Sequence, residues 1–310
     1  MNTKRRQSHS RISVRVMRPA HLPQARRLCV RAFPDTKGRL GFLDECASGK
    51  KQHAGALGLI AAEGQRLVGI LCCQVLEDPV LAPGRGPVAH VDLMAVHPAF
   101  RRRGVATMMW QRMEAKLVAM GIPSVWTRSR VISAGVDLRK HSEAVVFFLK
   151  MGFQKRQDIY DMTSRLDELD LDTSCAEAEL RRAGIEVKRI DYSECEALRQ
   201  FLSTSFPHWA GNADRVTRDG PQLIHIACAD GKIIGFAASE RRWFGPIGVE
   251  PGCRLKGIGK VLLLRGLRDI RARGYKRALI GWANFPFYAR SISASITRVM
   301  WQMEKRIGGE

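Results

Sequence analysis

The sequence predicts an α+β protein built from two copies of one mixed unit, and three observations carry this prediction. A loop at residues Val96–Ala106 returns at Val249–Gly259, with Val, Pro, Arg and Gly recurring at a constant offset of 153. A predicted strand ends just before each loop, and an apolar stripe with helical spacing follows it. Because a fixed offset marks an internal duplication, we expect strand, loop and helix at the centre of both copies.

The predicted elements follow the same order in both copies. Each copy opens on a β-branched strand and a helix, continues with a strand pair across an acidic-Gly turn, and then reaches the loop. In the first copy the opening strand is predicted at Ile12–Val16, the turn at Glu63-Gly64 and a strand after the loop helix at Ser124–Thr127. In the second copy the corresponding segments are Ile185–Ile190, Asp230-Gly231 and Arg277–Ile280.

The boundary between the copies is predicted from a change in composition. Residues 166–172 are acidic, and Ser174–Arg182 has Ser174 as N-cap, Glu177 three positions later and Gly184 as a stop, which predicts a short capped helix. We therefore divide the chain into a basic tail at 1–11, a first domain at 12–165, a linker at 166–184 and a second domain at 185–310.

Composition excludes several classes of protein. No apolar run approaches the ~18 residues that a bilayer span needs, so no membrane association is expected. The eight cysteines show no CxxC spacing and the eight histidines no HExxH spacing, which predicts a reducing, cytoplasmic location and no metal site. A net charge of +21 attracts phosphates, nucleic acids or acidic proteins, and the charge alone does not choose among them.

The repeated loop has the chemistry of an anion site. A strand that turns through glycine into a helix exposes unpaired backbone N–H groups at the positive end of the helix dipole. Gly104 and Gly257 allow the backbone to approach a phosphate closely, and Arg101 and Arg254 add positive charge. The recurrence of this arrangement after a strand and before an amphipathic helix predicts phosphate binding in both copies.

Both loops resemble the acyl-CoA motif [Q/R]xxGx[G/A] of the GNAT N-acetyltransferase superfamily, as Arg101-x-x-Gly104-x-Ala106 and Arg254-x-x-Gly257-x-Gly259. The chain therefore looks like a tandem GNAT protein, with a mixed, mostly antiparallel sheet flanked by helices in each domain. The resemblance implies that acetyl-CoA binds as co-substrate, without a metal, and donates its acetyl group directly to a primary amine of an unidentified small molecule or protein. The implied CoA-binding residues are Met94, Val96, Arg101, Arg102, Arg103, Gly104, Val105, Ala106 and Thr107 in the first copy, and Ile247, Val249, Arg254, Leu255, Lys256, Gly257, Ile258, Gly259 and Lys260 in the second.

Catalytic residues differ between the copies. Family members often carry a tyrosine on the last helix that protonates the CoA thiolate; Tyr288 takes this place in the second copy, whereas the first copy has Phe148. Asp92, on the strand leading to the loop, is the candidate general base of the first copy, and Gly245 replaces it in the second. We prefer the second copy as catalytic because of Tyr288 and its Gly-x-Gly loop, although its shorter connection predicts a truncated helix there.

A second interpretation stays open at this point. Arg-rich runs such as Arg101–Arg103 suit a CoA-regulated module that binds nucleic acid or an acidic protein without turnover. Aromatic residues are not interleaved with the basic runs, so we disfavour nucleic acid as a partner. Either a monomer or a dimer is compatible with the sequence.

Overall fold

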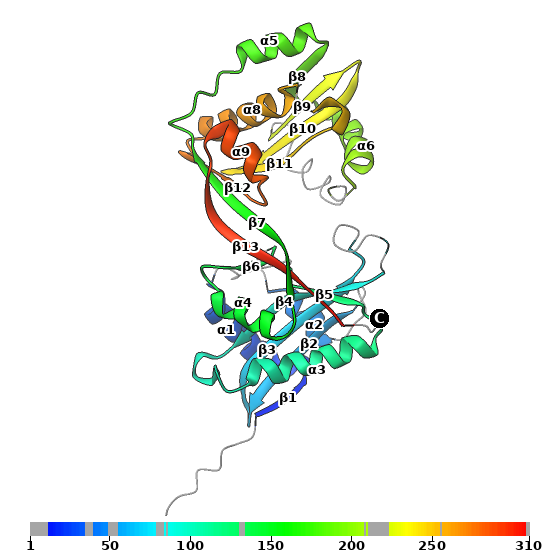
Figure 1. The fold of residues 1–310 in the computed structure, drawn as a ribbon, viewed down its shortest axis with the longest axis vertical. Coiled ribbons are helices and arrows are strands. Elements are labelled where there is room, and N and C mark those ends of the chain that lie inside the picture. The colour runs from blue at the N-terminus through cyan, green and yellow to red at the C-terminus, as the bar shows by residue number, and fades with distance from the viewer. Residues whose placement is uncertain are drawn as a thin grey trace, which may run out of the picture. The chain divides into compact units, whose positions relative to one another are not determined.

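The computed structural model describes residues 12–34, 40–48, 55–78, 84, 86–129, 134–207, 209, 223–254 and 256–307. The predicted tail at 1–11 and the predicted site residue Leu255 lie outside these residues. The chain divides into two compact units (Figure 1). The first unit contains residues 1–159 and 300–310, and the second contains residues 160–299.

The first unit is a sheet with helices on both faces. Its strands lie in the order β1-β2-β3-β4-β5-β13-β7, and β4 and β5 pair in parallel while β1 to β4 pair antiparallel. Its elements are β1 (Ile12–Val16), α1 (Leu22–Ala32), α2 (Phe42–Ser48), β2 (Ala56–Glu63), β3 (Arg66–Leu76), β4 (Val88–Val96), α3 (Val105–Ala119), β5 (Ser124–Trp126), β6 (Val136–Asp137), α4 (Ser142–Lys150) and β7 (Gln154–Arg165).

Successive residues of β3 show how the two faces of this sheet are covered. Ile70 and Cys72 are buried in the cluster that contains the inward side chains of α1 and α2. Leu71 and Cys73 are buried in the cluster that contains the inward side chains of α3. Because neighbouring side chains of a strand point to opposite faces, the almost continuous apolar run of β3 is satisfied by helices on both sides.

The second unit repeats this plan. Its strands lie in the order β13-β7-β12-β11-β10-β9-β8, and its α8 carries a buried stripe that includes Val261, Leu264 and Leu267. Its elements are α5 (Ser174–Arg182), β8 (Ile185–Arg189), α6 (Cys195–Ser205), β9 (Ile224–Ala229), β10 (Lys232–Glu240), β11 (Trp243–Val249), α8 (Ile258–Ala272), β12 (Arg277–Ile280), α9 (Phe285–Ile292) and β13 (Ser295–Arg306). The predicted fold class, two mixed sheets flanked by helices, is confirmed.

Strands β7 and β13, each twelve residues long, contribute to both units. In the first unit β13 pairs antiparallel with β5, with Glu304 opposite Trp126. In the second unit β7 pairs antiparallel with β12, with Arg165 opposite Arg277. Each unit therefore contains a strand from the other repeat, and the end of the chain, which we had placed in the second domain at 185–310, belongs to the first compact unit.

The segment predicted as a linker, residues 166–184, packs against α8 of the second unit. Leu166, Leu171 and Leu180 are buried in the same core as the inward face of α8. The predicted helix Ser174–Arg182 is confirmed as α5, but Thr173 rather than Ser174 is its N-cap residue. The segment at 166–184, which we had predicted as a linker, is thus packed into the core of the second unit.

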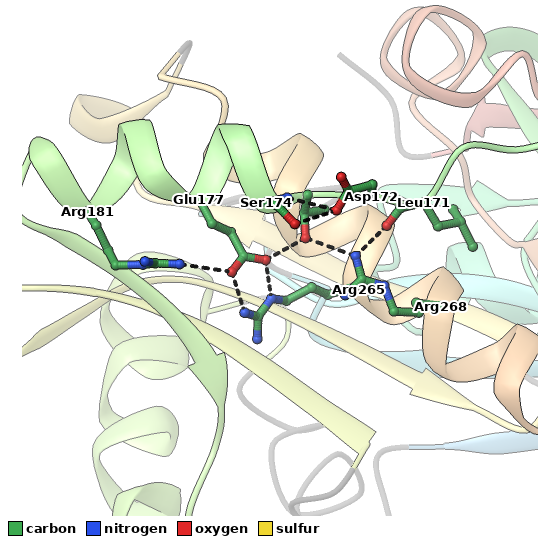
Figure 2. Close-up of polar contacts among 8 residues, drawn as sticks. Leu171, Asp172, Ser174, Glu177, Arg181, Arg265 and Arg268 are labelled. Carbon is green, nitrogen blue, oxygen red and sulfur yellow. Dashed lines mark hydrogen bonds and ion pairs between the residues drawn. The ribbon is translucent and has the colours of Figure 1, made fainter.

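Arginines of α8 hold this segment through polar contacts. Arg265 donates two hydrogen bonds to the carboxylate of Glu177, at 2.7 and 2.6 Å. Arg268 donates to Thr173 Oγ1 at 3.0 Å and to the carbonyl oxygen of Leu171. Figure 2 shows these contacts converging at the first turn of α5. The bidentate geometry makes the Glu177–Arg265 pair stronger than an ordinary surface ion pair.

We expect this pair to make the stability of the protein pH-dependent. The hydrogen bond from Arg265 lowers the pKa of Glu177 to about 2 from its usual value of 4.5. A carboxyl with a depressed pKa stabilises the fold above its unfolded pKa and loses this contribution as the pH falls through the folded value. Glu177→Gln should therefore lower the free energy of unfolding by about 1–2 kcal/mol at pH 7, and the difference should vanish between pH 4.5 and 2.

Urea unfolding at a series of pH values measures this difference. Glu179→Gln is the matched control, because Glu179 is an exposed carboxylate on the same helix. An equal loss of stability in both variants, or a Glu177 effect that does not change with pH, would contradict the expectation.

Candidate functional site

The repeated loop takes the same backbone conformation in both units. Gly104 and Gly257 are the N-cap residues of α3 and α8, with left-handed φ angles of 77° and 83°. Such angles favour glycine, which explains why this residue recurs. The first turn of each helix leaves its backbone N–H groups without intrahelical acceptors, so each loop has the donors that an anion needs.

The motif arginines close the loops through the backbone. Arg101 Nε donates to the carbonyl oxygen of Val96 at 3.3 Å, and Arg254 Nε donates to that of Val249 at 3.1 Å. Both bonds connect the loop to the end of the preceding strand, five residues earlier. We expected these arginines to supply charge; their matched hydrogen bonds also give them a structural role in setting the shape of the loop.

Strand β4 separates from β5 in the middle of the sheet. The two strands pair only at Ala89 and His90, opposite Val125 and Trp126, and from Val91 onward the β5 side of β4 faces a cavity. Asp92 lies in a bulge, because Cys72 is opposite Leu93 whereas Cys73 is opposite Val91. A bulge redirects side chains, and such irregularities are frequent next to active sites.

A cavity of about 860 Å³ occupies the opening between β4 and β5 in the first unit. This volume lies in the range of small-molecule sites. Asp92, although fully buried, lines the cavity together with the loop and α4. The Asp92 carboxylate also contributes, after burial, to raising the pKa of the neighbouring Cys73 thiol, so Cys73 stays protonated and is no nucleophile near neutral pH.

The cavity gathers most of the site residues predicted for the first copy. Of these, only Arg103 is absent from its lining; the others are Asp92, Met94, Val96, Arg101, Arg102, Gly104, Val105, Ala106 and Thr107. The predicted residues of the second copy lie at the end of β11 (Ile247 and Val249), in its loop (Arg254, Lys256 and Gly257) and on the first turn of α8 (Ile258, Gly259 and Lys260). Their roles stay predictions.

Sequence reasoning missed the other walls of the cavity. One wall contains Phe33 at the end of α1, and another contains Thr127, Gly135 and His141, between β5 and α4. These segments have no motif. The 13 residues by which the first copy exceeds the second between the loop helix and Phe148 were the only available signal. The described residues of this stretch contribute to the wall and do not lengthen the helix.

The end of the chain supports this wall within the first unit. Met303 N donates to Thr127 Oγ1 at 2.9 Å, and Thr127 N donates to the Met303 carbonyl at 2.9 Å. Gln302, which is 1% exposed, donates from Nε2 to the Ala134 carbonyl at 3.1 Å. Gly135 lies so close to β13 that a Cβ would stand 2.5 Å from the Trp301 carbonyl oxygen. Strand β13 therefore fixes the position of the cavity wall.

The residue at the place expected for the proton-donating tyrosine differs between the units. Phe148 of α4 lines the cavity, and its ring contacts that of Phe153 edge-on at 5.0 Å. Tyr288 of α9 is 5% exposed, contacts the Phe244 ring edge-on at 6.3 Å, and has its pKa raised by burial. The phenol is therefore neutral, and its role as a proton donor stays a prediction.

Helix α9 is nearly as long as α4, with eight residues against nine. The prediction of a truncated helix in the second copy was therefore wrong: the shorter copy lacks the connection before the helix, not the helix. Ser293, the C-cap residue of α9, takes the left-handed conformation with φ 46°.

In the second unit different residues stand at the end of β11 and beside the first turn of α8. Pro246 follows Gly245 in β11 and has no backbone N–H to offer to a ligand. A Cβ at Gly259 would lie 3.6 Å from the Phe287 ring, which is an ordinary van der Waals distance. The ring of Phe287 in α9 therefore lies beside the first turn of α8, where the resemblance implied CoA binding.

The described part of the chain lacks two further features. Within it, no helix is long and apolar enough to cross a membrane. The same residues contain no group of three or more His, Cys, Asp or Glu side chains that could hold a metal ion. All eight cysteines are free thiols.

Comparison with protein families gives one match that occurs twice. The model of the acetyltransferase (GNAT) family matches residues 22–153 and again residues 187–291. Together the two matches cover more than half of the chain. No curated protein matches significantly.

Solved structures resemble the chain over almost its full length. A GCN5-related glucosamine N-acetyltransferase region of a fungal multi-domain GH3 β-N-acetylglucosaminidase has a TM-score of 0.74 at 18% identity, covering 96% of this chain and 38% of that longer protein. A GCN5-related N-acetyltransferase from Sphaerobacter thermophilus has a TM-score of 0.61 at 17% identity, covering 96% of both chains. A tandem GNAT protein of the clavulanic acid biosynthesis pathway has a TM-score of 0.60 at 14% identity, covering 97% of this chain and all of that one. At these identities the likeness concerns the fold.

Proposed function

Since the chain belongs to the acetyltransferase (GNAT) family, with both repeats matching, we propose that it transfers an acetyl group from acetyl-CoA directly to a primary amine and that its first unit carries the reaction. One observation carries the choice of unit. The cavity of about 860 Å³ joins the glycine loop, the open side of β4 and the buried Asp92. This replaces our earlier preference for the second copy, which rested on Tyr288 and its Gly-x-Gly loop.

The residues around this cavity fit the parts of an acyl-CoA. The N–H groups at the start of α3 suit the pyrophosphate. On the side of β4 away from β3, no described strand pairs with residues 91–96. Their backbone groups can therefore bond an extended pantetheine arm and the thioester carbonyl. In the second unit Pro246 stands in the corresponding part of β11 and has no backbone N–H to bond such an arm, which supports the choice of the first.

The proposed reaction needs a neutral amine. Asp92 takes a proton from the attacking ammonium or amine, the nitrogen forms a bond to the thioester carbon, and the carbon–sulfur bond breaks to release CoA as its thiolate. Phe148 cannot donate a proton. A thiol of pKa about 8.5 is a good leaving group, so water in the cavity can protonate it.

Turnover on a panel of amines tests the proposal, with release of free thiol as the readout. We expect acetyl-CoA to bind and thiol to appear with the correct amine. Binding of nucleic acid with a steep salt dependence, together with no turnover on any amine, would favour the regulatory module instead. The pattern of free cysteines also supports a cytoplasmic location.

Asp92→Asn is expected to lower kcat by about a hundredfold, because general-base catalysis typically contributes 10²–10⁴-fold. The change keeps the shape of the side chain and removes its charge. Steady-state kinetics with acetyl-CoA measure the effect, and Asp158→Asn, which removes a carboxylate on β7 outside the cavity lining, is the control. An Asp92→Asn variant with unchanged kcat would show that Asp92 is not the base.

A further inference from the structure

A cluster of arginines that the motif does not include lies beside the loop of the first unit. Arg31 lies in the last turn of α1 and Arg66 begins β3. Both direct a guanidinium nitrogen at Nε2 of His97, at 3.5 and 3.1 Å. Arg66 and Arg103 each lie over the ring of Phe100, with 5.2 Å from guanidinium carbon to ring centroid. Three permanent positive charges thus surround two adjacent rings.

The cluster has no compensating acid among the residues that the structure describes. There, no carboxylate forms an ion pair with Arg31, Arg66 or Arg103. Burial and the charges of Arg66 and Arg31 lower the pKa of His97, so its ring is neutral at pH 7 and separates the guanidinium groups without adding charge. Arginines brought this close repel one another, and a doubly charged anion would relieve the repulsion through charge-assisted hydrogen bonds.

Comparison of the two repeats separates this cluster from the shared loop. At the offset of 153, Glu250 replaces His97 and Cys253 replaces Phe100. The loop glycine and the motif arginine recur, but the acidic Glu250 stands where the first repeat places the centre of its cluster. The shared loop conformation therefore does not require the cluster.

The cluster also lies next to the cavity. Phe100, which Arg66 and Arg103 flank, lines the cavity, as do Ala32 and Phe33, the residues that follow Arg31. Arg103 itself stands in the loop, directly before Gly104. An anion held by the cluster would thus be a neighbour of any phosphate bound at the first turn of α3.

We propose that Arg31, Arg66 and Arg103 form a phosphomonoester site beside the cavity and that this site takes the 3′-phosphate of the acyl-CoA. The inference rests on the proposed function. In CoA the ribose that carries the pyrophosphate also carries the 3′-phosphate, so a pyrophosphate on the loop brings the third phosphate close to the cluster. Guanidinium groups match a phosphate through paired N–H donors, and the site makes the enzyme select CoA over its 3′-dephospho form.

Calorimetry with CoA and 3′-dephospho-CoA tests the proposal on the full chain. We expect the wild-type protein to bind CoA about tenfold or more tightly than 3′-dephospho-CoA, since charge-assisted bonds to a phosphate are lost in the latter. In the Arg31→Ala/Arg66→Ala variant the preference should fall to about threefold or less, with the affinity for 3′-dephospho-CoA unchanged. Arg26→Ala is the matched control, because Arg26 lies on the same helix and contacts the exposed Asp44 instead.

The outcomes separate this inference from the function on which it rests. Equal affinity of the wild-type protein for both ligands would overturn the phosphate site and leave the acetyltransferase proposal standing. If the double variant bound CoA and 3′-dephospho-CoA more weakly by the same factor, the arginines would contribute only a general positive field. That result would also overturn the phosphate site. A double variant with unchanged CoA preference and a raised KM for the amine would assign the cluster to a phosphorylated acceptor instead. Absence of any CoA binding would overturn both proposals.

Discussion

Replacing Gly104 with glutamate is expected to lower kcat/KM for acetyl-CoA at least about a hundredfold, whereas Gly257→Glu retains most of the activity. Gly104 has a left-handed φ of 77°, which costs a non-glycine residue about 1–2 kcal/mol. The carboxylate would also stand at the N-terminus of α3, where it competes with the pyrophosphate for the same N–H groups. Both effects weaken acetyl-CoA binding in the unit that contains the cavity.

Thiol-release kinetics and calorimetry with CoA measure this difference. Gly121→Ala is the control for backbone strain, because Gly121 has a similar φ of 71° at the other end of α3 and open space where a Cβ would stand. If the second unit is catalytic, Gly257→Glu should lose turnover and Gly104→Glu should keep it. That result would place the reaction in the second unit, with Tyr288 as the candidate proton donor.

Gly135→Ala is expected to destabilise the protein by about 3 kcal/mol and to lower turnover at least about tenfold, because overpacking typically costs 1–3 kcal/mol and here displaces an active-site wall. The new Cβ would stand 2.5 Å from the carbonyl oxygen of Trp301, 2.8 Å from its carbonyl carbon and 3.0 Å from the amide nitrogen of Gln302. All three are backbone atoms of β13, which cannot turn away as a side chain can. Either the cavity wall or β13 must shift.

Thermal unfolding and steady-state kinetics on the full chain measure these effects. Gly41→Ala is the control, because no atom lies within 4 Å of a Cβ there and Gly41 does not need a left-handed backbone; it should change stability by less than about 0.5 kcal/mol. Full activity of Gly135→Ala would show that the contact between this wall and the end of the chain does not matter for catalysis.

Much of the site on the first copy was predictable because its residues are consecutive. The loop motif specifies a left-handed glycine at a helix N-terminus, and this local geometry follows from residues within one turn of one another. The strand before it is fixed by its apolar run, and so Asp92 could be placed beside the loop. The arginine cluster was not predictable, since Arg31 and Arg66 are far from His97 in sequence and meet it only through the packing of α1 and the sheet.

The sequence by itself determined the duplication, the fold of each unit and the two phosphate-type loops, because periodicity and turn chemistry act over short stretches of chain. Only the tertiary structure revealed the cavity of the first unit, since the wall at 134–136 is positioned by contacts with β13. The tertiary structure also decided that β13 completes the first unit. The last strands of the two repeats, β7 and β13, have similar patterns and could fill the same place in a sheet, so the choice depends on register with β5 and on packing.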